Sequence, residues 1–264
     1  MLGASRILPS FAGRRILAIR AGALGDTLLA LPSIGALRRF AGPSGGVDFV
    51  GTEPAVRLAL SPSLATRVHS IDRVPFRAFF DESADDGDLL SFLRTFALVA
   101  AWSNLPLLAR KLSNLGIPFL HASPSPPPGV HASDHLYASL WPLGIEGEAP
   151  PPVIVPEAES RAAALEFLNR NEIQPSSFVA LHPASGSPRK NWPRERFLEL
   201  AARIRNEGWP FVWIEGEADR DVVAFLGRRL EAPVARELPL PVLAALLSLS
   251  RGFVGNDSGV SHLA

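Results

Sequence analysis

The feature that most limits the fold of this chain is a repeated alternation of short apolar runs, tight turns and amphipathic segments of helix length. Its first unit runs from the apolar segment 16–19 through Gly22 and Gly25 to segment 26–40, where apolar side chains recur at helical spacing. A short, continuous apolar run suits a strand that is buried on both faces of a parallel sheet. Because neighbouring parallel strands need crossover connections, the repeat predicts an α/β fold with doubly wound parallel sheets.

The same alternation continues to the end of the sequence. The expected strands are 47–50, 67–71, 97–102, 118–121, 178–182, 211–215 and 252–255, and the expected helices are 54–60, 88–96, 105–115, 135–143, 158–171, 194–206, 220–230 and 241–250. A proline-rich stretch over 148–152 makes a natural connection between domains, since consecutive prolines exclude regular structure. We therefore predict two Rossmann-like domains, over residues 1–155 and 156–264.

Composition excludes several classes of protein. Twenty-six basic and twenty-six acidic residues give a formal net charge of zero, which argues against a nucleic-acid partner. Cysteine is absent, so disulfides, thiolate metal sites and cysteine nucleophiles are excluded. No stretch approaches the roughly 20 apolar residues of a membrane span, and residues 1–15 lack the apolar core of a signal peptide. We expect a cytoplasmic protein.

Ligands of open parallel sheets bind beyond the carboxyl ends of the strands, and three polar clusters follow expected strands. The first is Gly22-Ala-Leu-Gly25-Asp26. Its glycines would let a ligand approach the backbone, and the carboxylate of Asp26 could act as a base. A plain helix cap is the alternative, since aspartate is favoured there. The glycine order differs from G-x-G-x-x-G, which disfavours a nicotinamide-dependent dehydrogenase.

The second cluster covers 182–193 and combines the hydroxyls of Ser185 and Ser187 with the cations Arg189 and Lys190. A helix is expected to follow it. Hydroxyls, exposed amides and adjacent cations are the groups that a pyrophosphate requires. The alternative is a loop punctuated by proline, with solvated charges.

The third cluster, 256–262, contains Asp257, Ser258, Gly259 and His262 after an apolar strand. The free amides of a helix that begins near Ser258 would point at an anion. The alternative is a simple aspartate or serine cap with a surface histidine.

No metal site is predicted. The acidic residues Asp85, Asp86 and Asp88 form a D-x-D-like pattern, but no apolar strand leads into it, and loop acidity with helix capping explains it better. The histidines are scattered, and we interpret four of them as surface or core residues rather than ligands. These are His69, His121, His131 and His135.

The order of the three clusters is more specific than any one of them. The segments 20–26, 182–185, 190–193 and 255–264 together resemble the ADP-heptose:lipopolysaccharide heptosyltransferase family, glycosyltransferase family 9. The resemblance implies the GT-B arrangement of two Rossmann-like lobes, with the acceptor on the first, the sugar nucleotide on the second and the reaction in the cleft. It also implies transfer of a heptose-type sugar from an ADP-sugar to a lipopolysaccharide core, with inversion and without a metal.

Roles follow from the same resemblance. Asp26 would be the catalytic base, and Gly22 and Gly25 would form the acceptor-side loop. The residues implied for binding the nucleotide diphosphate are Ser185, Ser187, Lys190, Asp257, Ser258, Gly259 and His262. No cofactor is implied besides the donor, and the partners would be a nucleotide sugar and a lipopolysaccharide-type acceptor at the inner membrane surface, to which the protein would be peripheral.

Family members continue beyond His262-Leu-Ala264. The resemblance therefore implies a second lobe that is incomplete in this chain, and an exposed sheet edge would favour homo-oligomers. A catalytically silent relative that acts as a nucleotide-binding or assembly module is the alternative.

Overall fold

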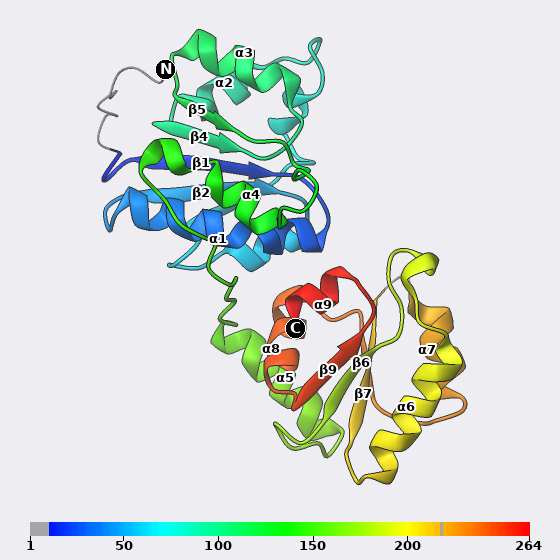
Figure 1. Ribbon diagram of the computed structural model, residues 1–264. Helices are drawn as coiled ribbons and strands as arrows, with labels where there is room; N and C mark the ends of the chain where they lie inside the picture. The colour runs from blue at the N-terminus through cyan, green and yellow to red at the C-terminus, as the bar shows by residue number, and fades with distance from the viewer. Residues whose placement is uncertain (1–10, 217–218) are drawn as a thin grey trace. The chain divides into compact units, whose positions relative to one another are not determined.

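The structure, a computed structural model, describes residues 11–216 and 219–264. It divides the chain into two units, Met1–Val153 and Ile154–Ala264, and the division follows directly after the proline-rich stretch that ends at Pro152. Residues 1–10, part of the segment in which we predict no signal peptide, lie outside the described residues. Each unit contains one parallel sheet with helices on both faces (Figure 1). The predicted α/β fold with two doubly wound parallel sheets is confirmed.

The first unit has a five-stranded sheet in the order β3-β2-β1-β4-β5. Its strands are β1 (Arg15–Arg20), β2 (Gly46–Gly51), β3 (Arg67–Ser70), β4 (Leu98–Ala101) and β5 (Phe119–His121). Its helices are α1 (Leu24–Ala41), α2 (Gly87–Leu93), α3 (Pro106–Leu115) and α4 (Ala132–Ala138), with 3-10 turns η1 (Ala55–Ala59), η2 (Phe76–Phe79) and η3 (Trp141–Leu143).

Burial on both faces explains the apolar run of β1. Leu17 and Ile19 pack into a core that also receives side chains from α2 and α3, whereas α1 and α4, which contact each other, cover the opposite face (Figure 1). The helix expected over 135–143 is instead split into α4 and η3. Pro142 accounts for the split, because proline removes a helix hydrogen bond and restricts the residue before it.

The second unit has a four-stranded parallel sheet in the order β8-β7-β6-β9. Its strands are β6 (Val179–His182), β7 (Phe211–Glu215), β8 (Val234–Arg236) and β9 (Gly252–Gly255). Its helices are α5 (Ala158–Arg170), α6 (Arg194–Asn206), α7 (Arg220–Gly227), α8 (Leu240–Ser248) and α9 (Gly259–Leu263), with the 3-10 turn η4 (Pro188–Lys190). Strand β8 was not predicted.

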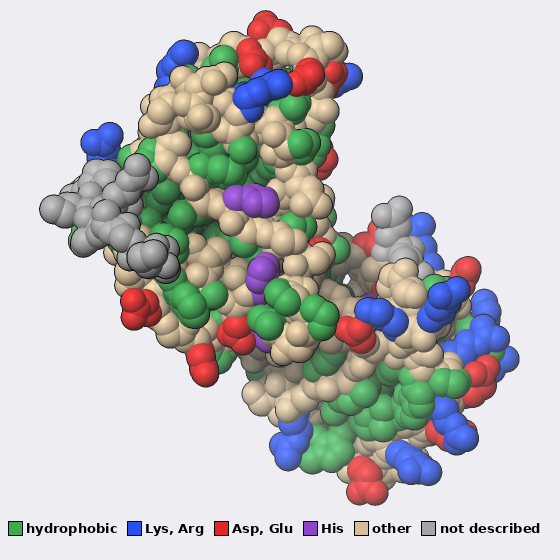
Figure 2. Space-filling model, turned by 45° about the horizontal axis from the view of Figure 1, so that its top comes forward, with side chains coloured by type: hydrophobic (Ala, Val, Ile, Leu, Met, Phe, Trp, Pro, Cys, Tyr) green, Lys and Arg blue, Asp and Glu red, His purple; other side chains and the backbone are tan. Residues whose placement is uncertain are grey.

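Successive side chains of β6 pack into two different hydrophobic cores. Ala180 packs with α5 and α8, and Leu181 packs with α6 and α7. On the outer side of α6 and α7, arginines stand among acidic side chains (Figure 2). That surface therefore carries both signs of charge. No helix in the described part of the chain is long and apolar enough to cross a membrane.

Candidate functional site

The loops that follow β6 (183–193) and β9 (256–258) emerge side by side, because His182 pairs with Gly255 in the sheet register. We call them the paired loops. The amide of Asn256 joins them: Nδ2 donates to the Pro183 carbonyl oxygen at 2.9 Å, and Oδ1 accepts from the Trp192 backbone nitrogen at 2.8 Å. Asn256 is buried. Two of the predicted clusters therefore lie together, and the residue that joins them, Asn256, was not among the predicted site residues.

Lys190 and Asp257 meet across the paired loops. Nζ of Lys190 lies 2.6 Å from Oδ2 of Asp257, and both side chains are more than half exposed. The hydrogen bond and charge of Lys190, with a smaller contribution from the charge of His262, lower the pKa of Asp257 below its ordinary value. Exposed ion pairs contribute little free energy, so an anionic ligand can replace Asp257 as the partner of the Lys190 ammonium with little loss of stability.

Ser185 shapes the first of the paired loops. Its Oγ lies 2.7 Å from Oδ1 of Asn191 and 2.9 Å from the Ser187 carbonyl oxygen, and it accepts from the Ser187 nitrogen at 3.3 Å. Ser187 precedes η4, and its carbonyl also accepts from the Lys190 nitrogen at 2.9 Å. The hydroxyl of Ser185 is therefore engaged within the loop, and its contact supports the turn that carries Lys190.

Ser258 caps the last helix. Its Oγ accepts from the Ser261 nitrogen at 3.4 Å, and α9 begins at Gly259. His262 is exposed on that helix. The serine cap considered as an alternative is thus present, and the same hydroxyl also lies 3.3 Å from Nδ1 of His182.

His182 and Asp219 form a buried pair beneath the paired loops. Nε2 of His182 lies 2.9 Å from Oδ2 of Asp219, and this oxygen also accepts from the Gly216 nitrogen at 2.9 Å. Burial is the largest single influence on the pKa of Asp219 and raises it. The hydrogen bonds from His182 and Gly216 together outweigh burial, so the pKa of Asp219 lies below its ordinary value. Neither residue was selected as a site residue from the sequence, because 37 positions separate them.

Asp26 lies in the first unit, in the first turn of α1 after the end of β1. Its Oδ2 accepts from the Ala23 nitrogen at 2.8 Å, and its Oδ1 accepts from Nη2 of Arg20. The Arg20 guanidinium is buried and also donates from Nη1 to the Trp102 carbonyl oxygen at 2.8 Å. The side chain of Asp26 is 38% exposed. Asp26 is therefore a capping residue and an oriented, accessible carboxylate at the same time.

Gly22 makes room for this carboxylate. Its φ is +151°, and a Cβ at this position would lie 2.5 Å from Oδ2 of Asp26. Its nitrogen donates to Oγ1 of Thr52 at 3.1 Å. Gly25 lies within the first turn of α1. The loop thus needs glycine at position 22 in order to place Asp26.

The acidic segment near residue 86 is accounted for by local contacts. Lys111 Nζ lies 2.5 Å from Oδ2 of Asp86, and the Gly87 nitrogen donates to Oδ1 of Asp85 at 3.0 Å. Asp88 lies in the first turn of α2.

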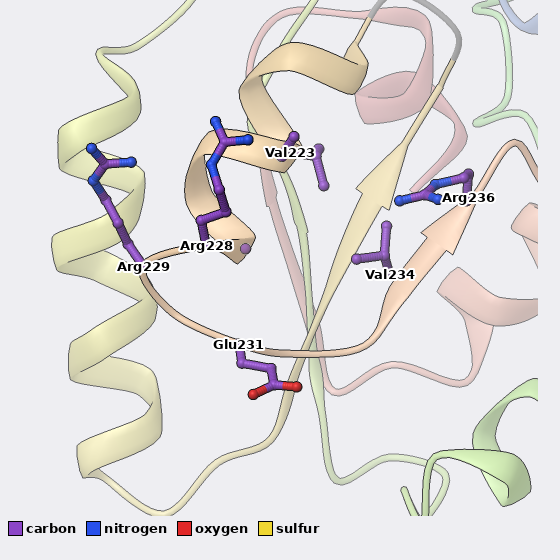
Figure 3. A pocket seen from close by; sticks show the side chains of 8 residues that line it. Val223, Arg228, Arg229, Glu231, Val234 and Arg236 are labelled. Atoms are coloured by element: carbon purple, nitrogen blue, oxygen red, sulfur yellow. The ribbon is translucent and has the colours of Figure 1, made fainter.

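A cavity of about 490 Å³ lies between α7 and β8, and none of the predicted site residues lines it (Figure 3). Val223 and Val234 point into it, and Arg228 and Arg236 stand at its sides (Figure 3). The guanidinium of Arg229 instead stacks on the ring of Phe225, at 3.7 Å from its centroid. The cavity shares no lining residue with the paired loops, so we do not assign the predicted chemistry to it.

Known structures define the class of fold. A glycosyl transferase family 9 structure from Veillonella parvula matches with a TM-score of 0.79 and 21% identity, covering 96% of this chain and 78% of that one. The structure of the E. coli ADP-heptose lipopolysaccharide heptosyltransferase II matches with a TM-score of 0.72 and 15% identity, covering 95% of this chain and 81% of that one. These likenesses show a GT-B-like fold.

Sequence comparison gives the family. The model of glycosyltransferase family 9 (heptosyltransferase) matches residues 110–264, more than half of the chain. Lipopolysaccharide heptosyltransferase 2 of Salmonella typhimurium is 32% identical over 88 residues, which cover 31% of this chain and 25% of that protein. The chain belongs to glycosyltransferase family 9, and its alignment spans about a quarter of the length of the curated relatives that it matches.

Proposed function

We propose that this protein is an inverting, metal-independent glycosyltransferase that moves a heptose-type sugar from an ADP-sugar to a lipopolysaccharide core acceptor. Family membership supports the reaction class. The observation that carries the proposal is the contact between Lys190 and Asp257 across the paired loops, with Ser258 next to Asp257 in the sequence. These groups lie beyond the carboxyl ends of parallel strands, where such sheets bind nucleotides.

The paired loops would bind the donor diphosphate. When the sugar leaves, negative charge grows on the diphosphate, and a cation placed there stabilises the transition state. Lys190 offers such a cation, since its partner Asp257 is exposed and holds it only through a solvated contact. Ser258 adds a hydroxyl, with Gly259 beside it and His262 one turn further on. Ser185 and Ser187 support the loop that presents Lys190.

Asp26 would accept the proton of the acceptor hydroxyl. As that oxygen bonds to the anomeric carbon, the bond from this carbon to the diphosphate breaks, and the proton passes to the carboxylate. Arg20 and the Ala23 amide hold the two carboxylate oxygens, which fixes the orientation of the base. A positioned base of this kind typically contributes about 10²–10⁴-fold to the rate.

In this proposal the donor is the only nucleotide and no cofactor takes part. With such an acceptor, the protein would act in the cytoplasm, peripheral to the inner membrane. Self-association stays a prediction, which light scattering of the purified chain would test.

A catalytically silent relative that binds nucleotide or serves assembly is the second candidate. One observation favours it: both oxygens of Asp26 already accept hydrogen bonds, and Lys190 is already paired. Such a protein would bind ADP but would not transfer sugar.

A transfer assay separates the two candidates. The purified chain is incubated with ADP-heptose and a truncated lipopolysaccharide acceptor, and released ADP and extended acceptor are both measured. Stoichiometric formation of both products, lost in Asp26→Asn, supports the transferase. Binding of ADP without product formation supports the silent relative, and absence of both contradicts each candidate.

A further inference from the structure

The buried pair of His182 and Asp219 points toward the proposed donor site rather than away from it. Both side chains are almost fully buried, at 5% and 6% exposure. Two side-chain contacts link Asp219 at the start of α7 to His182 at the end of β6, and His182 to Ser258 at the cap of α9. They thus connect the interior of the second unit to a hydroxyl of the paired loops.

The contacts settle which imidazole nitrogen carries hydrogen. Oδ2 of Asp219 is an acceptor, so Nε2 of His182 must donate to it. In a neutral imidazole the other nitrogen, Nδ1, then has only a lone pair. In the contact with the Ser258 hydroxyl, 3.3 Å away, Nδ1 can then only accept, and the hydroxyl is the donor.

Ser258 has one proton and two acceptors for it. Besides Nδ1 of His182, Oγ of Ser261 lies 3.3 Å from Oγ of Ser258, and the Ser261 hydroxyl itself donates to the Asn256 carbonyl oxygen. With His182 neutral, the proton of Ser258 is therefore directed into the protein. Protonation of Nδ1 reverses the contact: Nδ1 then donates to Oγ, and the hydroxyl can turn its proton to a ligand.

Other charged groups around the end of β6 are engaged elsewhere. Glu215 at the end of β7 pairs with Arg236, Lys190 pairs with Asp257, and His262 is exposed on α9. Arg220 at the start of α7 pairs with Glu237. Among the residues that the structure describes, Asp219 alone forms an ion pair with His182. Its carboxylate is placed to compensate an imidazolium.

We propose that His182 and Asp219 are positioning residues that couple diphosphate binding to the uptake of one proton at Nδ1 of His182. The inference rests on the proposed donor site at the paired loops. The proton comes from bulk solvent, turns the Ser258 hydroxyl toward a phosphate oxygen and returns to solvent on release. A bound anion favours the imidazolium, and by linkage a lower pH favours binding.

Proton uptake can be measured directly. ADP is titrated calorimetrically into the full chain at one pH, in two buffers with different heats of ionisation. The difference between the two observed binding enthalpies gives the number of protons taken up. The variants are Asp219→Asn, which removes the compensating charge, and His182→Gln, which can still donate to Asp219 but cannot be protonated. Asp48→Asn, in a buried aspartate–histidine pair of the first unit, is the matched control.

We expect the wild type and Asp48→Asn to take up more protons than Asp219→Asn and His182→Gln, and to bind ADP about tenfold more tightly at the lower end of the pH range. Ionisation of ADP itself contributes equally to all four proteins, so it cancels in the comparison. Equal proton uptake in all four proteins overturns the inference and leaves the proposed function standing. So does a loss of proton uptake in Asp48→Asn as large as that in Asp219→Asn. Failure of the wild type to bind ADP overturns both.

Discussion

Each unit of this protein buries an aspartate that is hydrogen-bonded to a histidine, and the two pairs differ in what else they contact. In the first unit Asp48 lies within β2, 2.7 Å from Nη2 of Arg15 and 2.8 Å from Nε2 of His69. The rings of Phe76 and Phe92 pack edge-on against His69. In the second unit His182 stands at the end of its strand, and its second nitrogen faces Ser258.

This difference separates a structural pair from a functional one. For both aspartates burial raises the pKa, yet hydrogen bonds lower it more, with Arg15 adding to the effect at Asp48. The chemistry of the pairs is therefore alike. Their positions are not: one pair is held among aromatic rings, and the other supports the cap of α9 at the paired loops. The predictions below test this contrast between the units.

The largest effect is expected in the first unit, at Asp26. Asp26→Asn keeps the shape of the side chain and can still accept from the Ala23 amide, but it cannot take up a proton at neutral pH. We expect turnover to fall by about 10²–10⁴-fold with ADP affinity unchanged. Steady-state kinetics combined with ADP titration measures this split. A parallel loss of ADP affinity would contradict the separate roles of the two units.

The next effect is expected in the second unit, at Lys190. Lys190→Ala removes the cation of the paired loops, and ADP affinity should fall about 10–100-fold, since a hydrogen bond to a charged group contributes roughly 1.5–3 kcal/mol. Lys111→Ala is the natural control, because Lys111 is the other lysine of the sequence and lies on α3 of the first unit. Equal affinity of the two variants would show that Lys190 does not contact the ligand.

A smaller effect, on stability alone, is expected at Asp48. Asp48→Asn should lower the free energy of unfolding by about 1–3 kcal/mol, since it weakens hydrogen bonds to Arg15 and His69. The pKa of Asp48 is lowered on folding, so its contribution is present at neutral pH and is lost as pH falls below its ordinary value of 3.8 and through the folded pKa. Urea unfolding of both proteins between pH 7 and pH 3 tests this. If the two proteins differ in free energy of unfolding as much at pH 3 as at pH 7, the ionised carboxylate of Asp48 is not the source of the stability.

The smallest effect is expected at Ser185, which acts on the ligand only through the loop. Ser185→Ala removes a neutral hydrogen bond to Asn191, worth roughly 1 kcal/mol, and ADP affinity should fall about fivefold. Titration of Ser185→Ala and Lys190→Ala with ADP shows which of the two residues contributes more to ADP affinity. A loss as large as that of Lys190→Ala would place Ser185 in direct contact with the diphosphate.

The sequence predicted what depends on local pattern. The apolar runs of β1, β6 and β9 and the polar residues after them are contiguous, so their elements and the clusters at their ends could be located. The short edge strand β8 was missed, because its three residues include Arg236 and form no continuous apolar run.

Contacts across long separations could not be predicted in the same way. Lys190 and Asp257 are 67 positions apart, and although the resemblance implied that both bind one diphosphate, no pattern in either segment indicates that they form an ion pair. The same holds for His182 and Asp219, whose partnership depends on where α7 begins relative to β6. The buried Arg20 beside Asp26 was visible in the motif, but its hydrogen bond to the Trp102 carbonyl spans 82 positions.

The most direct test of the account is a crystal structure of the chain soaked with ADP. We predict density for the diphosphate at the paired loops, with a phosphate oxygen within hydrogen-bond distance of both Lys190 Nζ and Ser258 Oγ, and with the contact between Lys190 and Asp257 opened. Density in the cavity between α7 and β8 instead, or an intact ion pair beside an empty pair of loops, would contradict it.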